Sequence, residues 1–228
     1  MKHSIYNVAM IAMILGLAGC NKVIDWGKDQ FKQGKKIEKY TDEPQHHVRS
    51  ITLYDQFTTE GMFDALWLSD DVRTAFANVH ALKRGHNEEQ RTVFLRRQLE
   101  ENNLFISFYV LSPYEKPLGE PNSEWVAFLE INGTSYRPIE VKAVDLSPEY
   151  QAFFGKKFTR FKEKYSIRFD AKDIEDRLLI KNDTKNIRLV FRSNENEASL
   201  VWDLVDGKLA NNTNKAVKKN VENSVALS

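Results

Sequence analysis

Residues 125–137, WVAFLEINGTSYR, decide the expected fold. Apolar side chains recur at every second position, at Trp125, Ala127, Leu129 and Ile131. This period of two indicates a strand with one face directed toward a core. The strand ends at Asn132-Gly133, the dipeptide most typical of a tight type I′ hairpin, so we expect the chain to turn back. We place the returning strand at about residues 134–144, where Pro138 predicts an edge position or a bulge.

The same pattern continues on both sides of this hairpin. Residues 104–111 form an apolar run and are expected to be a strand buried on both faces, and a shorter strand is expected at residues 50–57. Three further strands are marked by alternating apolar residues, at Tyr165, Ile167 and Phe169, at Ile187, Leu189 and Phe191, and at Leu200, Trp202 and Leu204. Five or more short strands with turns between them favour an antiparallel sandwich.

Two helices are predicted between the first strands. Ser69 is a suitable N-cap, acidic residues follow it, and Gly85 supplies the stop after two basic residues. The second helix follows Asn87, which stands at capping-box spacing from Gln90. Because only a short turn separates the helices, we expect a helical hairpin at about residues 69–101.

The expected fold class is α+β, a helical hairpin followed by an antiparallel β-sandwich-like domain. One further short helix is expected at residues 147–154. The domain organisation that we predict is a leader at 1–19, a tether and linker at 20–49, a globular domain at 50–205 and a polar, disordered tail at 206–228. Valines repeat every four residues in the tail, which leaves a weak helix open as an alternative.

The first 20 residues carry the most specific motif of the chain. Lys2 gives a positive start, and an apolar run at residues 8–18 leads to Leu17-Ala18-Gly19-Cys20. A membrane-spanning helix needs about 20 apolar residues, so this run is too short to cross a bilayer stably. A positive start, a short apolar run and small residues before a cut are typical of a secretory signal peptide. The last four residues resemble the lipobox of bacterial lipoproteins.

This resemblance implies that the Cys20 thiol carries a diacylglyceryl group, that cleavage removes residues 1–19, and that the new amino terminus is acylated in many bacteria. One acyl chain anchors a protein only marginally, at about 0.8 kcal/mol per buried CH₂, whereas two chains anchor it stably. Asn21 resembles the outer-membrane class of Gram-negative lipoproteins, in which aspartate at this position usually signals inner-membrane retention. The alternative is an ordinary signal peptide with a cysteine near its end by chance.

The segment after Cys20 is basic. Residues 22–40 have a helical pattern and contain six lysines against three acidic residues. Behind a lipid anchor such a helix could lie on an anionic membrane, where each lysine contributes about 1 kcal/mol. Alternatively it is a solvated tether whose aromatic side chains dock on the globular domain. Residues 40–49 contain Pro44 and are predicted to be a linker.

Composition excludes some classes of function. The formal net charge is +1 over 228 residues, with 29% charged and 42% hydrophobic residues. Loss of Lys2 with the leader would balance the charges, and a neutral chain is not expected to bind nucleic acid. Cys20 is the only cysteine, so no internal disulfide framework is possible.

The usual catalytic motifs are absent from the sequence. It has no Gly-x-Ser-x-Gly elbow, no Ser-x-x-Lys or Lys-Thr-Gly, no His-Glu-x-x-His, and no phosphate-loop or dinucleotide glycine pattern. A catalytic site, a metal site and a cofactor are therefore not expected. Carboxylates that meet only in the fold leave a hydrolase open as an alternative.

The histidines are expected to be structural. His46 and His47 are adjacent in the predicted linker, where chelation of a metal is less favoured than a solvated pair. His80 and His86 stand near the end of the first helix, where positive imidazoles would favour the helix terminus.

Residues 153–165 alternate aromatic and basic side chains. Lys156, Lys157 and Arg160 are the weak candidates for a ligand-binding site, because basic and aromatic side chains together can bind anionic glycans or lipid head groups. The same pattern arises where a strand and the segment before it bury aromatics and leave lysines in water.

The expected function is a membrane-anchored, non-enzymatic envelope lipoprotein that contacts another envelope protein. A sheet edge or the helical hairpin would form the contact surface. The alternative is a protein that binds or hydrolyses envelope polymers. An apolar patch at the surface would favour the first function, and a deep cleft with acidic or histidine side chains would favour the second.

Overall fold

The computed structural model describes residues 32, 34–55, 58–206, 208–209 and 215–220. Two compact units are distinguished, residues 1–39 and 40–228. The described residues of the first unit are helical and mostly exposed. The predicted leader and Cys20 lie outside the described residues. No helix in the described part of the chain is both long and apolar enough to span a membrane.

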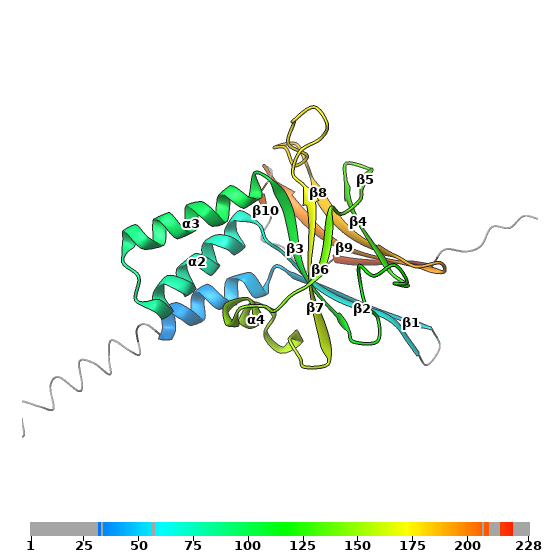
Figure 1. The fold of residues 1–228 in the computed structure, drawn as a ribbon, viewed down its shortest axis with the longest axis horizontal. Helices are drawn as coiled ribbons and strands as arrows, with labels where there is room; N and C mark the ends of the chain where they lie inside the picture. The colour runs from blue at the N-terminus through cyan, green and yellow to red at the C-terminus, as the bar shows by residue number, and fades with distance from the viewer. Residues whose placement is uncertain (1–31, 33, 56–57, 207, 210–214, 221–228) are drawn as a thin grey trace, which may run out of the picture. The chain divides into compact units, whose positions relative to one another are not determined.

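The second unit is a mixed α/β structure, mostly of strands in two antiparallel sheets (Figure 1). The first sheet has the order β1 (Val48–Asp55), β2 (Thr58–Trp67), β3 (Phe105–Pro113), β7 (Lys162–Asp170) and β6 (Glu140–Ala143). The second has the order β10 (Lys208–Leu209), β9 (Asn196–Val205), β8 (Asn186–Arg192), β4 (Val126–Ile131) and β5 (Thr134–Tyr136). A further strand, β11 (Lys215–Asn220), also pairs with β9.

Side chains from both sheets share one hydrophobic core. Phe63 of β2 stacks on Phe191 of β8 with ring centroids 4.0 Å apart, and Phe108 of β3 lies 5.2 Å from Trp202 of β9. The alternating residues that the sequence assigns to the core of β4, β7, β8 and β9 are all buried there, as predicted. Full burial of one such side chain contributes about 1.5–3 kcal/mol, so these layers hold the unit together.

The turn after β4 is confirmed, but the strand after it was predicted wrongly. Asn132 and Gly133 both have positive φ, 50° and 81°, as a type I′ turn requires. The single strand predicted at 134–144 is two strands in different sheets, since β5 pairs with β4 and β6 pairs with β7. Pro138 lies between them, where it removes a backbone donor and ends the first pairing.

The first sheet contains a strand that the sequence analysis missed. The predicted strand at 50–57 is β1, but its partner β2 was not expected. The pattern of β2 is obscured because Asp64 and Leu66 are also buried, on the face opposite Phe63. β3 is buried on both faces as predicted, with Val110 in the shared core and Leu111 fully buried on the other side.

The predicted helix ends are confirmed. In α2 (Asp70–Arg84) the Val72 N–H donates to Ser69 Oγ at 3.4 Å, and Gly85 adopts a left-handed conformation with φ 65°. In α3 (Glu88–Asn102) Asn87 and Gln90 form the predicted capping box. The expected short helix is α4 (Pro148–Phe154).

Helices cover the face of the first sheet that points away from the shared core (Figure 1). Phe76 of α2 stacks on Tyr150 of α4 at 4.2 Å, and Tyr150 meets Tyr109 of β3 at 4.8 Å. Tyr109 alternates with the core residues Phe108 and Val110, so it belongs to the opposite face.

Two segments differ from the sequence analysis. The predicted linker at 40–49 is helical over residues 40–45 and enters β1 at Val48. The predicted disordered tail includes β11, which pairs antiparallel with β9. A polar composition hides such a strand, because backbone hydrogen bonds rather than side chains define its pairing.

Candidate functional site

The structure separates the three basic residues that the sequence groups as ligand candidates. Lys157, at the end of the 3₁₀ helix η1 (Gly155–Lys157), has its Nζ 3.5 Å from Oδ1 of Asp64. Lys162 Nζ lies 2.5 Å from Oδ2 of the same carboxylate, which is only 4% exposed. Ser50 donates a hydrogen bond to Asp64 and accepts one from Lys157. Lys157 is therefore part of a polar cluster that neutralises a buried carboxylate.

Lys156 and Arg160 are instead exposed. The Arg160 guanidinium lies 4.8 Å from the ring centre of Phe161, whose side chain is 70% exposed. The neighbouring aromatic residues Phe153, Phe154 and Tyr165 are buried. Most of this basic and aromatic segment therefore has the structural role that the sequence analysis gave as the alternative to ligand binding. Within the segment, only Arg160 and Phe161 form a pair of an exposed cation and an exposed ring.

The sequence analysis favoured a solvated pair at His46 and His47, but only His46 is exposed, and His47 is buried. His47 is 5% exposed, and its carbonyl oxygen accepts a hydrogen bond from Trp202 Nε1 at 2.9 Å. Burial, with the nearby charge of Arg49, lowers the pKa of His47 to about 4. His80 stacks on Phe94 at 4.4 Å, and burial followed by the charge of Arg84 lowers the pKa of His80. Burial of His80 disfavours the positive imidazole that the sequence analysis expected near this helix terminus.

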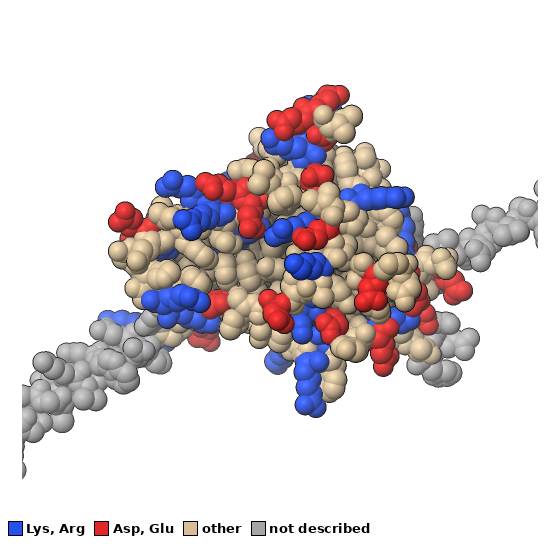
Figure 2. Space-filling view, viewed as in Figure 1, with Lys and Arg blue, Asp and Glu red and all other residues tan. Residues whose placement is uncertain are grey.

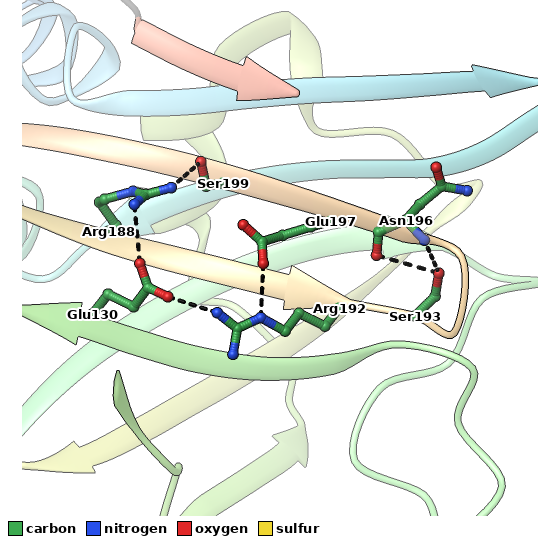
Figure 3. A network of polar contacts seen from close by, with 7 residues as sticks. All are labelled: Glu130, Arg188, Arg192, Ser193, Asn196, Glu197 and Ser199. Atoms are coloured by element: carbon green, nitrogen blue, oxygen red, sulfur yellow. Dashed lines mark hydrogen bonds and ion pairs between the residues drawn. The ribbon is translucent and has the colours of Figure 1, made fainter. Parts of the chain in front are cut away.

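The outer face of the second sheet carries a network of ion pairs (Figure 3). Glu130 of β4 accepts from Arg188 at 3.0 Å and from Arg192 at 2.7 Å, and Arg192 also donates to Glu197 at 2.8 Å. Beneath these side chains Val190 is fully buried. The network covers this apolar surface, and its positive and negative side chains pair with one another. This pairing favours a structural role over ligand binding.

A hollow lies where β3 begins, between the end of α3 and the segment after β7. It consists of two adjoining cavities of about 270 and 400 Å³ that share Asn103 and Phe105, and we call it the β3 groove. The apolar lining of the first cavity is Trp67, Phe105, Ile106, Ala171, Leu178 and Ile180. Its polar lining is Ser69, Asp70, Asp71, Asn102, Asn103 and Lys208. The second cavity adds Leu104, Asp170, Lys172, Asp173, Ile174 and Asp176.

A chain of hydrogen bonds fixes one wall of the β3 groove. Asn102 Nδ2 donates to Asp70 Oδ1 at 2.7 Å, and Asn102 Oδ1 accepts from Arg73 Nε at 2.6 Å. Arg73 is 2% exposed and also pairs with Glu101 at 3.0 Å. These contacts join the start of α2 to the end of α3, so the wall has a defined shape before any ligand arrives.

The opposite wall is the segment after β7. Its loop is the yellow projection at the top of Figure 1, and Figure 2 shows acidic and basic side chains at its tip. Asp173 accepts hydrogen bonds from the Arg177 backbone N–H and side chain, which hold the pKa of Asp173 below its usual range. Lys172 pairs with Asp176 at 2.8 Å. The loop is thus ordered by its own polar contacts, although Ile174 at its tip is fully exposed.

Sequence reasoning missed the β3 groove because its lining comes from four separate parts of the chain. One local signal was present. Ile174 is a single apolar residue in the charged run KDIEDR at residues 172–177, and such a residue has no core to enter.

Comparison with known proteins gives no family for this chain: no protein-family model matches it, and searches of curated proteins and of solved structures found no significant match. Within the part of the chain that the structure describes, no group of three or more histidine, cysteine, aspartate or glutamate residues could hold a metal ion. The β3 groove is an apolar hollow with a charged rim.

Proposed function

We propose that this protein is a bacterial envelope lipoprotein that acts as a non-enzymatic interaction module. Acyl chains on Cys20 anchor it to the membrane, which is the outer membrane in a Gram-negative cell. The basic segment after Cys20 connects the anchor to the globular domain. In this proposal the domain consists of a helical hairpin, α2 and α3, and a β-sandwich-like body, and it holds a partner protein of the envelope at the β3 groove.

One observation carries the proposal. Leu104, Ile174 and Leu178 are exposed by 61%, 104% and 48%, and all three line the β3 groove. An exposed apolar side chain gains free energy when a partner covers it, so apolar residues gathered beside a hollow indicate an interaction site. Figure 2 shows acidic and basic side chains interspersed on the face in view, which argues against a single charged field as the main recognition feature.

The anchor is tested by metabolic labelling with a fatty acid that carries a chemical handle. The parent protein should be labelled and should partition into the detergent phase. Cys20→Ala should lose both properties, because it has no thiol to acylate. Unchanged labelling or partitioning in Cys20→Ala would contradict the lipoprotein proposal.

The interaction is tested by crosslinking in living cells, followed by pull-down and mass spectrometry. We expect one dominant protein partner, lost in Cys20→Ala and reduced in the double variant Leu104→Ser/Ile174→Ser. Val205→Ser is the matched control, because Val205 is also an exposed apolar residue, 62% exposed, but does not line the β3 groove. Recovery of no protein partner, or of glycan fragments instead, would contradict the proposal.

A second candidate function is binding of an anionic envelope glycan or lipid head group. The exposed pair of Arg160 and Phe161 favours it, because a guanidinium beside a ring can attract an anion and stack on a sugar. Lys157 is left out of this test, since its reversal would place a carboxylate against the buried Asp64.

The measurement is co-sedimentation with a purified anionic envelope polysaccharide. Binding should fall in the double variant Lys156→Glu/Arg160→Glu. The matched control is Lys181→Glu/Lys185→Glu, which reverses two exposed lysines elsewhere on the surface. Equal binding by both double variants and the parent would show that Lys156 and Arg160 form only a solvated face.

A further inference from the structure

The floor of the β3 groove offers room for a small apolar group. Trp67, Ile106 and Ala171 form it and are 7%, 5% and 3% exposed. The first cavity, about 270 Å³, is close to the lower limit of about 300 Å³ for ligand pockets. At about 30 Å³ per water molecule this space equals roughly nine waters. Such a volume accepts one large aliphatic side chain rather than an extended cofactor.

The rim adds a preference for positive charge. Asp71 in the first turn of α2 lines the first cavity, and Asp170 at the end of β7 lines the second. Neither carboxylate forms an ion pair with a residue that the structure describes, whereas the nearby Lys172 is neutralised by Asp176. Lys208 is the basic residue on the rim of the first cavity, so the carboxylates outweigh it.

The apolar floor and the two carboxylates lie close enough together to contact one short peptide segment. Phe105 and Asn103 line both cavities, so the floor is continuous with the exposed Leu104 and Ile174. A segment that inserts an aliphatic side chain at Trp67 and follows this floor passes both unpaired carboxylates. Its flanking residues gain most when they are lysine or arginine, because opposite charges at an interface rim favour association.

We propose that the β3 groove binds a basic amphipathic peptide segment of the envelope partner. A leucine-sized side chain enters the first cavity, and lysine or arginine side chains beside it pair with Asp71 and Asp170. This inference rests on the proposed function, since it names the chemistry of the partner at the same site. It excludes an acidic segment, because carboxylates would meet the two aspartates.

The test titrates a fluorescent five-residue peptide of alternating lysine and leucine. The protein is the full lipidated chain in nanodiscs of neutral phosphatidylcholine, and empty nanodiscs serve as the blank. Saturable binding should raise the peptide anisotropy and shift the emission of Trp67. Loss of the emission shift in Trp67→Phe should identify Trp67 as the source of that shift. A peptide with glutamate in place of lysine should not bind.

Two variants, each in the first turn of a helix, test whether peptide binding depends on the groove or only on the overall charge of the protein. Asp71→Lys should weaken peptide binding about fivefold or more, as expected when an attractive surface pair becomes repulsive. Glu89→Lys is the matched control, because Glu89 also occupies an acidic first turn, in α3, and does not line the groove. Leu178→Ser should also weaken peptide binding, because it removes an exposed apolar side chain from the lining of the groove. Equal effects of Asp71→Lys and Glu89→Lys would overturn the inference.

Other outcomes are equally decisive. Equal binding of the glutamate peptide would refute the charge preference. A dimer of this chain that occludes the groove, found by sedimentation velocity, would show that a second copy is the occupant instead. If neither peptide binds while the groove still determines crosslinking in cells, the inference fails and the proposed function stands. If the lysine peptide binds but no envelope protein is crosslinked, the proposed function fails instead.

Discussion

The cluster around Asp64 gives the sharpest prediction for stability. Asp64 is 4% exposed, and two lysines reach its carboxylate from different depths. Lys162 is 14% exposed with its Nζ 2.5 Å from Oδ2, whereas Lys157 is 41% exposed with its Nζ 3.5 Å from Oδ1. Loss of one partner from a buried ion pair costs about 3–5 kcal/mol. Exposed pairs contribute only about 0.2–1 kcal/mol.

These values predict an unequal response to the two lysine variants. Lys162→Met should lower the free energy of unfolding by about 2–3 kcal/mol, less than the full buried value because Lys157 and Ser50 still contact Asp64. Lys157→Met should cost less than about 1 kcal/mol. With an m-value of about 2 kcal/mol per molar urea, Lys162→Met shifts the unfolding midpoint by roughly 1 M.

The assay is urea unfolding followed by far-UV circular dichroism, with Asp64→Asn and the double variant Asp64→Asn/Lys162→Met completing a cycle. The double variant should be less destabilised than the sum of the two single variants, because the lysine charge no longer lacks a partner. Equal effects of Lys157→Met and Lys162→Met, or additive effects in the cycle, would refute this reasoning.

Three further predictions use the same assay. Gly61→Ala should destabilise the protein by about 1–3 kcal/mol, because a Cβ there would lie 3.0 Å from the Trp125 ring and overpack the core; an unchanged midpoint would contradict this packing. Gly133→Ala should cost about 1 kcal/mol, since φ is 81° at the turn; a smaller cost than that of Gly34→Ala would count against it. The folded-state pKa of His47, about 4, is below its ordinary 6.5. Stability should therefore fall by up to about 3 kcal/mol as the pH drops from 6.5 to 4, since only the unfolded chain takes up the proton. His47→Gln should flatten this dependence, and an equally steep slope in that variant would exclude His47 as its cause.

Local patterns in the sequence predict most of the regular structure. The caps of α2 and α3 were predictable because Ser69, Gly85 and the pair Asn87 and Gln90 act on backbone groups within a few residues. The core faces of β4, β7, β8 and β9 were predictable for a similar reason, since one buried face imposes alternation directly on the sequence.

The sequence analysis failed at β2, whose buried residues do not alternate, and at residues 134–144, where the chain changes sheets. β2 buries Phe63 on one face and Asp64 and Leu66 on the other, so its pattern does not alternate. The division into β5 and β6 depends on which neighbours are free to pair, and Pro138 alone predicts only an irregularity.

The β3 groove could not be predicted from local patterns, because it exists only when four separated segments meet. Trp67 and Ile106 line it as residues of two strands, and their sequence pattern is that of ordinary core positions. The sequence groups the basic residues Lys156, Lys157 and Arg160 because they lie close together along the chain. Closeness along the chain does not show which amine faces a buried carboxylate, and Asp64 lies about ninety residues away from Lys157.

The most direct test of the central claim is site-specific photocrosslinking in living cells. A photoreactive phenylalanine analogue is introduced at the position of Ile174, in the β3 groove, or at that of Val126, which is 49% exposed on the second sheet. The proposal predicts a single protein adduct from the Ile174 position, absent from the Val126 position and lost with Cys20→Ala. No adduct from the Ile174 position, or the same adduct from both positions, would contradict it.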